Sequence, residues 1–156
     1  MIVKPITFYV SSGGVFFRKS QKFKKAMVKE MGFSFLESIV LVNVCENPGT
    51  TQEMVAHKLA LDVAAVARSL KQMEDRKLIR RTVDPNNQRA KQINALPKGE
   101  SAKKEMDRIT DYWNNLLFSD FSQNELEEIS AVLKKIQKKA IDIDVDQLVQ
   151  ALVKAK

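Results

Sequence analysis

Apolar residues recur at helical spacing through two short neighbouring segments of the chain. Val66, Leu70 and Met73 follow one another at intervals of three or four residues, and Asp62 stands where a helix cap is expected. The segment 50–60 repeats this pattern over a shorter length. About three residues separate the two predicted helices, a spacing typical of the helix-turn-helix motif.

Other helix starts are indicated by a Ser or Thr followed three residues later by a Glu. In this capping-box spacing the two side chains satisfy free amides of a helix's first turn. Three pairs have the spacing: Ser34 with Glu37, Thr50 with Glu53, and Ser122 with Glu125. The first pair precedes the apolar run "FLESIVLVNVCEN", which Pro48 and Gly49 close. These pairs predict helices that begin near residues 34, 50 and 122.

After the helix-turn-helix segment the chain changes to a pattern typical of β-strands. The runs "LIRRTV" and "AKQINA" flank residues 84–87, which read Asp-Pro-Asn-Asn. Proline presets its backbone angle, and Asp and Asn hydrogen-bond locally or tolerate left-handed geometry, so this is strong turn chemistry. The segment predicts a β-hairpin.

A long helix is predicted after the hairpin. Pro97 suits its first turn, and the apolar positions continue at helical spacing from Met106 to Leu117. The later run "IDIDVD" alternates like a strand for six residues. We favour a break between helices at 141–144, because helical spacing resumes afterwards and Asp144 with Gln147 can cap the new turn.

The N-terminal segment also has a helical pattern, with apolar residues along one side and Lys or Arg around the rest. Gly13 and Gly14 interrupt it, and each costs about 1 kcal/mol inside a helix. Either the helix begins after the glycines, or they permit close packing against a neighbouring helix. Together the terminal helices carry more apolar positions than a compact helix-turn-helix core uses, which suggests a homodimer intertwined through both chain ends.

Positive charge is concentrated in two parts of the chain. The net charge is +7, and residues 68–104 alone hold eleven Lys or Arg against four Asp or Glu. Residues 18–31 hold six against one, whereas residues 105–156 hold seven against ten. A basic hairpin beside a helix pair indicates a polyanionic partner. The alternative is a solvated, lysine-rich surface.

Several classes of protein are disfavoured by what the chain contains. No apolar run reaches the ~18–20 residues of a membrane span, and no basic head with an apolar stretch marks an export signal. We therefore expect a single cytoplasmic domain with no membrane partner. The lone Cys45 excludes an internal disulfide, and the lone His57 has no second ligand at metal spacing. Without a phosphate-binding glycine loop or a nucleophile–base pair, we expect no catalysis, metal or cofactor.

From "GFSFLESIVLVNVCENPGTT" through the basic strand, Asp84-Pro85, Arg89 and Lys98-Gly99, the chain resembles the MarR family of winged-helix transcriptional regulators. The resemblance implies a mainly α fold with a small β-hairpin wing and a homodimer made by N- and C-terminal helices. It implies a winged helix-turn-helix DNA-binding lobe at 33–96, with a recognition helix at 62–74 and a wing at 79–96. Residues 1–32 and 97–156 would form the helical dimerisation region of a single MarR-like chain, 1–156.

The sequence departs from the family pattern at three places. Asn87 stands where an acid often precedes the wing arginine, and Lys77 stands where a glycine is common. The start of the recognition helix, often rich in Ser and Thr, is Val63-Ala64-Ala65. The first and third departures bear on base contacts.

Candidate DNA contacts lie on the outward side of the recognition helix, on the wing, and at the start of the first motif helix, whose N-terminal amides can hold a phosphate. Alanines allow close approach and contact thymine methyls, Arg68 pairs with guanine or phosphate, and Lys71 pairs with phosphate. A surface salt bridge of Arg68 with Glu74 or Asp75 is the alternative. Arg89 can reach a narrow minor groove, unless the basic hairpin only prevents aggregation. The candidates are Thr51, Gln52, Ala64, Ala65, Ala67, Arg68, Lys71, Arg81, Arg89 and Lys91.

Two further expectations concern small molecules and redox chemistry. Family members often bind small aromatic or lipophilic effectors between the dimer helices and the DNA-binding lobe. Aromatic residues that such a pocket could use, besides their roles in the core and the dimer, are Phe16, Phe23, Phe33, Tyr112 and Trp113. Cys45 reads as a buried small hydrophobe rather than the redox sensor found in some family members.

The sequence therefore favours a sequence-specific regulator of transcription that binds double-stranded DNA. We expect a ligand-responsive repressor that binds a pseudo-palindromic site as a homodimer. The alternative is a winged-helix module that binds proteins, or binds nucleic acid nonspecifically, having lost specific DNA reading. The alanine-rich recognition helix and the missing wing acid favour this alternative, and the wing's charge argues against it.

Overall fold

The computed structural model of the protein describes residues 6–84 and 87–154. Helices and an antiparallel strand pair make up the described part of the chain. Their bounds are α1 (Ile6–Glu30), α2 (Phe35–Glu46), α3 (Gln52–Leu59), α4 (Val63–Asp75), β1 (Ile79–Asp84), β2 (Asn87–Ala95), α5 (Pro97–Phe118), α6 (Gln123–Ala140) and α7 (Val145–Lys154). None of the helices within these residues is long and apolar enough to cross a membrane.

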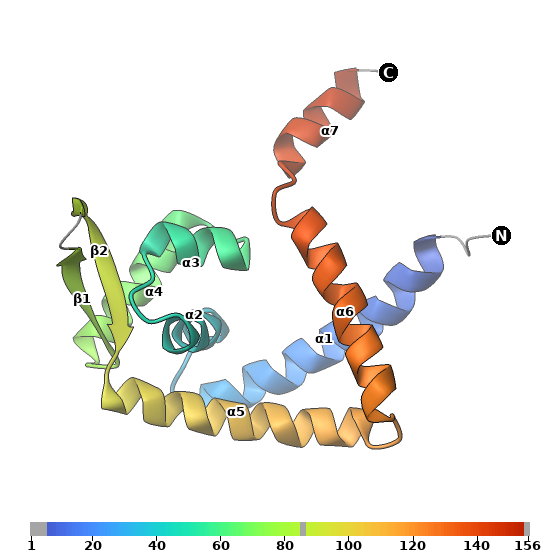
Figure 1. The fold of residues 1–156 in the computed structure, drawn as a ribbon, viewed down its shortest axis with the longest axis horizontal. Coiled ribbons are helices and arrows are strands. Elements are labelled where there is room, and N and C mark those ends of the chain that lie inside the picture. Colours follow the sequence, from blue (N-terminus) through green and yellow to red (C-terminus); the bar gives the residue numbers. More distant parts are fainter. Residues whose placement is uncertain (1–5, 85–86, 155–156) are drawn as a thin grey trace.

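The elements divide between a packed lobe and extended helices (Figure 1). The lobe holds α2, α3, α4 and the β1–β2 pair, at the N-terminal end of the long helix α5. Helix α1 contacts both α2 and α5. Helices α6 and α7 lead away from the far end of α5 as a C-terminal arm, and the junction between them lies beside α3, where Asp142 is 3.3 Å from His57. This is the mainly helical arrangement with a small β-hairpin wing that the resemblance implies.

The core of the lobe lies between α2, α4 and the strands. Val66, Leu70 and Met73 have no exposed area, so the predicted apolar face of α4 is confirmed. Leu41 of α2 is also fully buried, and Ile93 of β2 is 1% exposed. Burial of each such side chain is worth ~1.5–3 kcal/mol, and this fixes α4 on the lobe with its opposite face in solvent.

The predicted helix starts are confirmed at two of three capping boxes. Those of Ser34 and Ser122 are present. The expected start at Thr50 is wrong, because Thr51 caps α3 and accepts from the Met54 amide. Thr50 instead exchanges main-chain contacts with the second strand, and its carbonyl accepts from the Ile93 amide at 2.8 Å. Helix α3 therefore begins one residue later than the spacing predicts.

The chain ends differ in how well the pattern predicts them. Helix α1 runs through Gly13 and Gly14, so of the two alternatives the one in which the helix begins after them is wrong. A Cβ added to Gly13 would meet no atom, so no close packing within the described chain accounts for that residue. The favoured break at 141–144 is confirmed, since α6 ends at Ala140 and the Gln147 amide donates to Asp144 at 2.9 Å.

The register of the strand pair decides which way its basic residues face. Arg81 pairs with Ile93, and Val83 pairs with Lys91. Because side chains alternate along a strand, Arg81 shares a face with the buried Ile79 and Ile93. Arg80 points to the opposite face and is exposed. The strands extend to Asp84 and Asn87, and the other two residues of the predicted turn, 85–86, lie outside the described residues.

Candidate nucleic-acid interface

The outward face of α4 carries small and basic side chains. Ala64, Arg68 and Lys71 are exposed, and Ala65 and Ala67 are half-buried. The Asp62 carboxylate caps the helix by accepting from the Ala65 amide at 2.8 Å, which fixes where this face begins. Small side chains in the first turns let the backbone approach a flat or grooved surface closely. This side of α4 is therefore narrow enough to fit into a groove of a binding partner.

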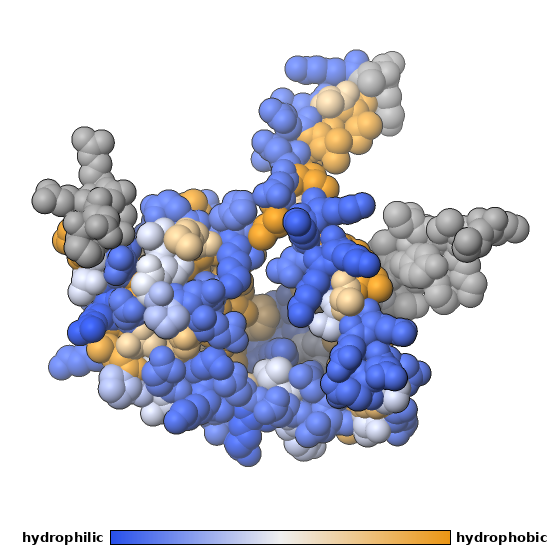
Figure 2. All heavy atoms as spheres, viewed as in Figure 1, coloured by the Kyte–Doolittle hydropathy of each residue, from blue (hydrophilic) through white to orange (hydrophobic). Residues whose placement is uncertain are grey.

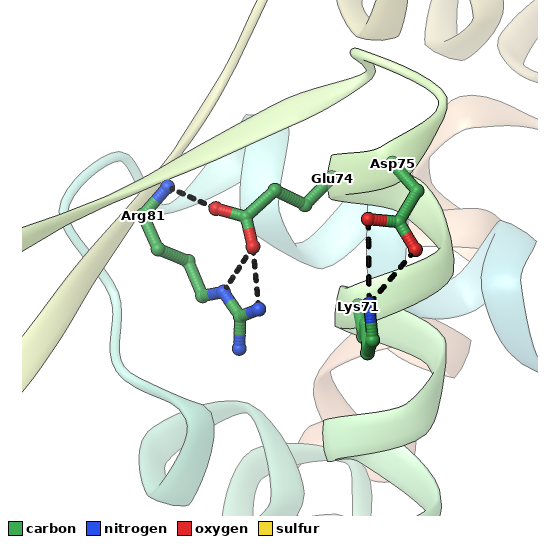
Figure 3. A network of polar contacts seen from close by, with 4 residues as sticks. All are labelled: Lys71, Glu74, Asp75 and Arg81. Atoms are coloured by element: carbon green, nitrogen blue, oxygen red, sulfur yellow. Dashed lines mark hydrogen bonds and ion pairs between the residues drawn. The ribbon is translucent and has the colours of Figure 1, made fainter.

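Lys71 on this face and Arg81 on the neighbouring strand β1 already have acidic partners (Figure 3). The Lys71 ammonium lies 3.1 Å from Asp75, and both side chains are more than 60% exposed. Arg81 donates its main-chain N–H and its guanidinium to Glu74, and only 22% of the Arg81 side chain is exposed. These hydrogen bonds from Arg81 lower the pKa of the Glu74 carboxyl below its usual range. The carboxylate is thus held in its charged form.

Arg68 differs from both of these residues. The sequence allows a salt bridge from Arg68 to Glu74 or Asp75, but those carboxylates bind Arg81 and Lys71. Among the ion pairs between described residues, none involves Arg68 or Arg80. Arg80 was not among the sequence candidates. Strand alternation is the signal that finds it, because the residue before an inward Arg81 must point outward.

The remaining basic candidates lie on the second strand. Lys91 is exposed and pairs across the ladder with Val83. Arg89 belongs to β2, but its side chain lies outside the described residues. The expected DNA contact of Arg89 stays a prediction from the sequence.

Thr51 and Gln52 lie at the start of α3. The Thr51 hydroxyl already accepts from the Met54 amide at 3.3 Å, so it satisfies one of the first-turn N–H groups itself. Gln52 is the first residue of the helix and is half-buried. An anion at this end would therefore meet the remaining amides rather than a free threonine.

The aromatic candidates link α1 to α5 and to the lobe. Phe23 stacks on Trp113 with ring centroids 4.8 Å apart, and the Trp113 indole donates to Ser20 at 2.9 Å. The ring centroid of Tyr112 lies 6.3 Å from that of Phe23. Phe33 is buried in the lobe beneath the guanidinium of Arg76, and Phe16 lies 6.0 Å from Phe118. These contacts pack α1 on α5 and hold Phe33 in the core of the lobe.

A cavity of about 400 Å³ lies where α1, α2 and α5 meet. Its wall includes Lys24, Val28, Ile39, Asn43 and Met106, and none of the five aromatic candidates is part of it. Burial lowers the pKa of Lys24. The side-chain oxygen of Asn43 is buried and has no hydrogen-bond partner among the described residues. The cavity is thus largely apolar, with a few polar groups that a small molecule could engage.

Neither Cys45 nor His57 has the surroundings of a reactive residue. Burial, and then the negative charge of Glu100, raise the pKa of the Cys45 thiol to about 12. Such a thiol has almost no reactive thiolate at neutral pH, which disfavours a redox role. His57 lies 3.3 Å from Asp142, with both side chains exposed. No group of three or more metal-ligating side chains occurs within residues 6–84 and 87–154.

Comparison with known proteins gives consistent matches. A model of the MarR family matches residues 31–90. A protein of Bacillus subtilis (strain 168), YybA, described as an uncharacterized HTH-type transcriptional regulator, is 28% identical over 110 residues, which are 70% of this chain and 73% of that protein. A MarR-family transcriptional regulator from Listeria monocytogenes, solved with a 26mer DNA, is 26% identical with a TM-score of 0.79 over 85% of this chain and 89% of that chain.

A second solved structure has a similar fold. CouR from Rhodococcus jostii RHA1, solved with bound p-coumaroyl-CoA, has a TM-score of 0.73 at 24% identity, over 86% of this chain and 92% of that chain. The matched family segment of residues 31–90 contains α2, α3, α4 and β1, which are the elements that carry most of the basic candidates.

Proposed function

We propose that this chain, a winged-helix transcriptional regulator of the MarR family, binds a specific pseudo-palindromic DNA site as a homodimer and acts as a ligand-responsive repressor. In this proposal α4 enters the major groove and the β1–β2 wing meets the minor groove or backbone. The protein acts in the cytoplasm, and it has no catalytic role.

The observation that carries the DNA proposal is the face of α4 that holds Arg68. Arg68 is exposed, no described carboxylate pairs with it, and small alanines lie beside it. An arginine in this position can bind guanine through two hydrogen bonds, and alanine can contact the methyl of thymine. Lys71 and Lys91, both exposed, would contact phosphate. Arg89 is assigned to the minor groove from the sequence.

The dimer proposal rests on the apolar faces of the helical arm. Ile129, Val132, Leu133 and Ile136 lie along one side of α6, and each is at least 39% exposed. Helix α7 continues this pattern, and Figure 2 shows apolar side chains gathered along one side of it. Contiguous apolar surface of this kind marks an interface. We propose that residues 1–32 and 97–156 form the dimer, and that residues 33–96 form the DNA-binding lobe.

Leu133→Asp tests the dimer. Leu133 is 56% exposed, so an aspartate is tolerated in the monomer but would be buried and uncompensated in the proposed interface. We expect sedimentation equilibrium to show wild-type dimers and a shift of Leu133→Asp toward monomers. Val83→Asp is the control, since Val83 is 57% exposed on β1, which lies on the side of the lobe away from α6 and α7 (Figure 1). A monomeric wild-type protein, or a variant as dimeric as the control, would contradict the proposal.

The cavity between α1, α2 and α5 is the proposed effector site. Its apolar wall fits a small aromatic or lipophilic molecule, and it lies where the lobe meets the helices that would form the dimer. The bound p-coumaroyl-CoA of CouR shows that a protein of similar fold can hold a small molecule. A ligand there would change the separation of the two lobes. Such a molecule should release the DNA from wild-type protein but not from Ile39→Trp, which fills the cavity.

Fluorescence anisotropy with the DNA upstream of the protein's own gene, and with a scrambled duplex, tests specific binding. A specific regulator should prefer the upstream DNA by at least ~10³, with a steep dependence on salt. Equal affinity for both duplexes would favour the alternative of nonspecific nucleic-acid binding. No binding at low salt would reject DNA recognition and favour a protein-interaction module.

A further inference from the structure

One carboxylate joins the recognition helix to the wing. Glu74 lies in the last turn of α4, and both of its oxygens accept from Arg81 of β1. One oxygen accepts the main-chain N–H at 3.2 Å, and the other accepts the guanidinium at 2.9 Å. Because the Arg81 N–H bonds to Glu74, it points away from the partner strand β2. Glu74 therefore binds the free edge of β1, through the Arg81 N–H, as well as the Arg81 side chain (Figure 3).

Arg81 and Lys71 are held in different ways. The Arg81 side chain is 22% exposed, faces the same side as buried Ile93, and bonds to Glu74 through both main chain and side chain. Among the described residues, Lys71 bonds to Asp75 alone, on its own helix, and is 70% exposed. Exposed single pairs of this kind are worth roughly 0–1 kcal/mol, so Lys71 can exchange Asp75 for a phosphate at little cost. Arg81 would have to break several bonds and leave a carboxylate facing the DNA.

We infer that Glu74 is a positioning residue for DNA recognition, which fixes the wing on α4 through Arg81. Arg81 then acts through the placement of the wing and not as a phosphate ligand. This inference rests on the proposed DNA-binding function, and it assigns Arg81 a role different from the DNA contact that its charge suggests. Glu74, at the end of α4, is the carboxylate that braces Arg81 of the wing.

The two assignments of Arg81 predict opposite signs for one substitution. If Glu74 positions the wing, Glu74→Ala weakens binding to the preferred duplex by about tenfold, the loss typical of a charge-assisted hydrogen bond. If Arg81 contacts phosphate, the same substitution frees Arg81 and removes a negative charge, so binding tightens. Asp75→Ala is the matched control when both substitutions are made in a Lys71→Gln background, because it then removes the same charge from the adjacent residue without freeing the Lys71 ammonium, and it leaves the wing contact intact. Fluorescence anisotropy compares the affinities of the variants for the preferred duplex, at a temperature where all of them are folded.

The dependence of affinity on salt separates a contact from a positioning role. A lost phosphate contact lowers the salt slope by ~0.9, which is expected for Lys71→Gln. For Arg81→Gln we expect weaker binding with an unchanged slope. Tighter binding by Glu74→Ala than by Asp75→Ala, or a slope lowered by Arg81→Gln, would overturn the inference. Equal binding by Glu74→Ala and Asp75→Ala would overturn it as well.

Amide hydrogen exchange tests the brace without DNA. Glu74→Ala should speed hydrogen exchange of the Arg81 amide and leave exchange of the α2 amides unchanged. Asp75→Ala should change neither. Unchanged exchange at Arg81 would overturn the inference even if the protein binds DNA. If wild-type protein bound no duplex, the DNA-binding proposal and the positioning role would both fail, whereas faster exchange would still establish the contact itself.

Discussion

Gly99→Ala is expected to lower the free energy of unfolding by about 1–3 kcal/mol, the usual cost of overpacking a tightly packed site. Gly99 lies in the first turn of α5, and a Cβ there would stand 2.2 Å from the carbonyl oxygen of Leu78. That carbonyl is main chain and already accepts from the Leu96 amide at 2.9 Å, so it cannot turn aside freely. The variant must move α5 away from the start of β1.

Gly13→Ala is the matched control for this substitution. Gly13 is also helical, but a Cβ there meets no atom, so alanine should stabilise α1 by ~0.5–1 kcal/mol. Urea unfolding measures both variants, and an unchanged m-value shows that the difference lies in stability. A Gly99→Ala protein as stable as wild type would mean that α5 and β1 are not packed as closely as the structure shows.

Arg68→Ala is expected to weaken binding to the preferred DNA by ~1–3 kcal/mol, as for loss of a base contact. The reason is that Arg68 projects from the middle of α4 without a described acidic partner, so its guanidinium is available to the DNA. Anisotropy with specific and scrambled duplexes measures the effect. A base contact predicts a loss confined to the specific duplex, whereas a phosphate contact predicts a similar loss on both.

Lys104→Ala is the control for Arg68→Ala. Lys104 is an exposed cation on α5, outside the lobe, and its removal changes the net charge by the same amount. We expect it to bind like wild type apart from a small change common to both duplexes. If Arg68→Ala behaved like Lys104→Ala, α4 would not be the helix that reads DNA.

The sequence determined the order and the type of the elements. Helical spacing of Val66, Leu70 and Met73 identified the buried face of α4, and the Asp62 cap fixed its start. These features depend on residues a few positions apart, which is why periodicity and capping chemistry predict them. The outward place of Arg68 followed from the same periodicity.

Only the tertiary structure decided which charges are available and which glycine is required. Arg81 looked like a wing contact, but the strand register turns it toward Ile93, and Glu74 binds it across the helix–strand junction. Glycine is required at position 99 because a Cβ there would collide with the carbonyl oxygen of Leu78, which lies far earlier in the chain. Of the aromatic candidates, Phe16, Phe23, Tyr112 and Trp113 pack α1 on α5, and none of the five lines the cavity. These outcomes depend on pairs that are brought together by the packing of separate elements, and local sequence does not specify them.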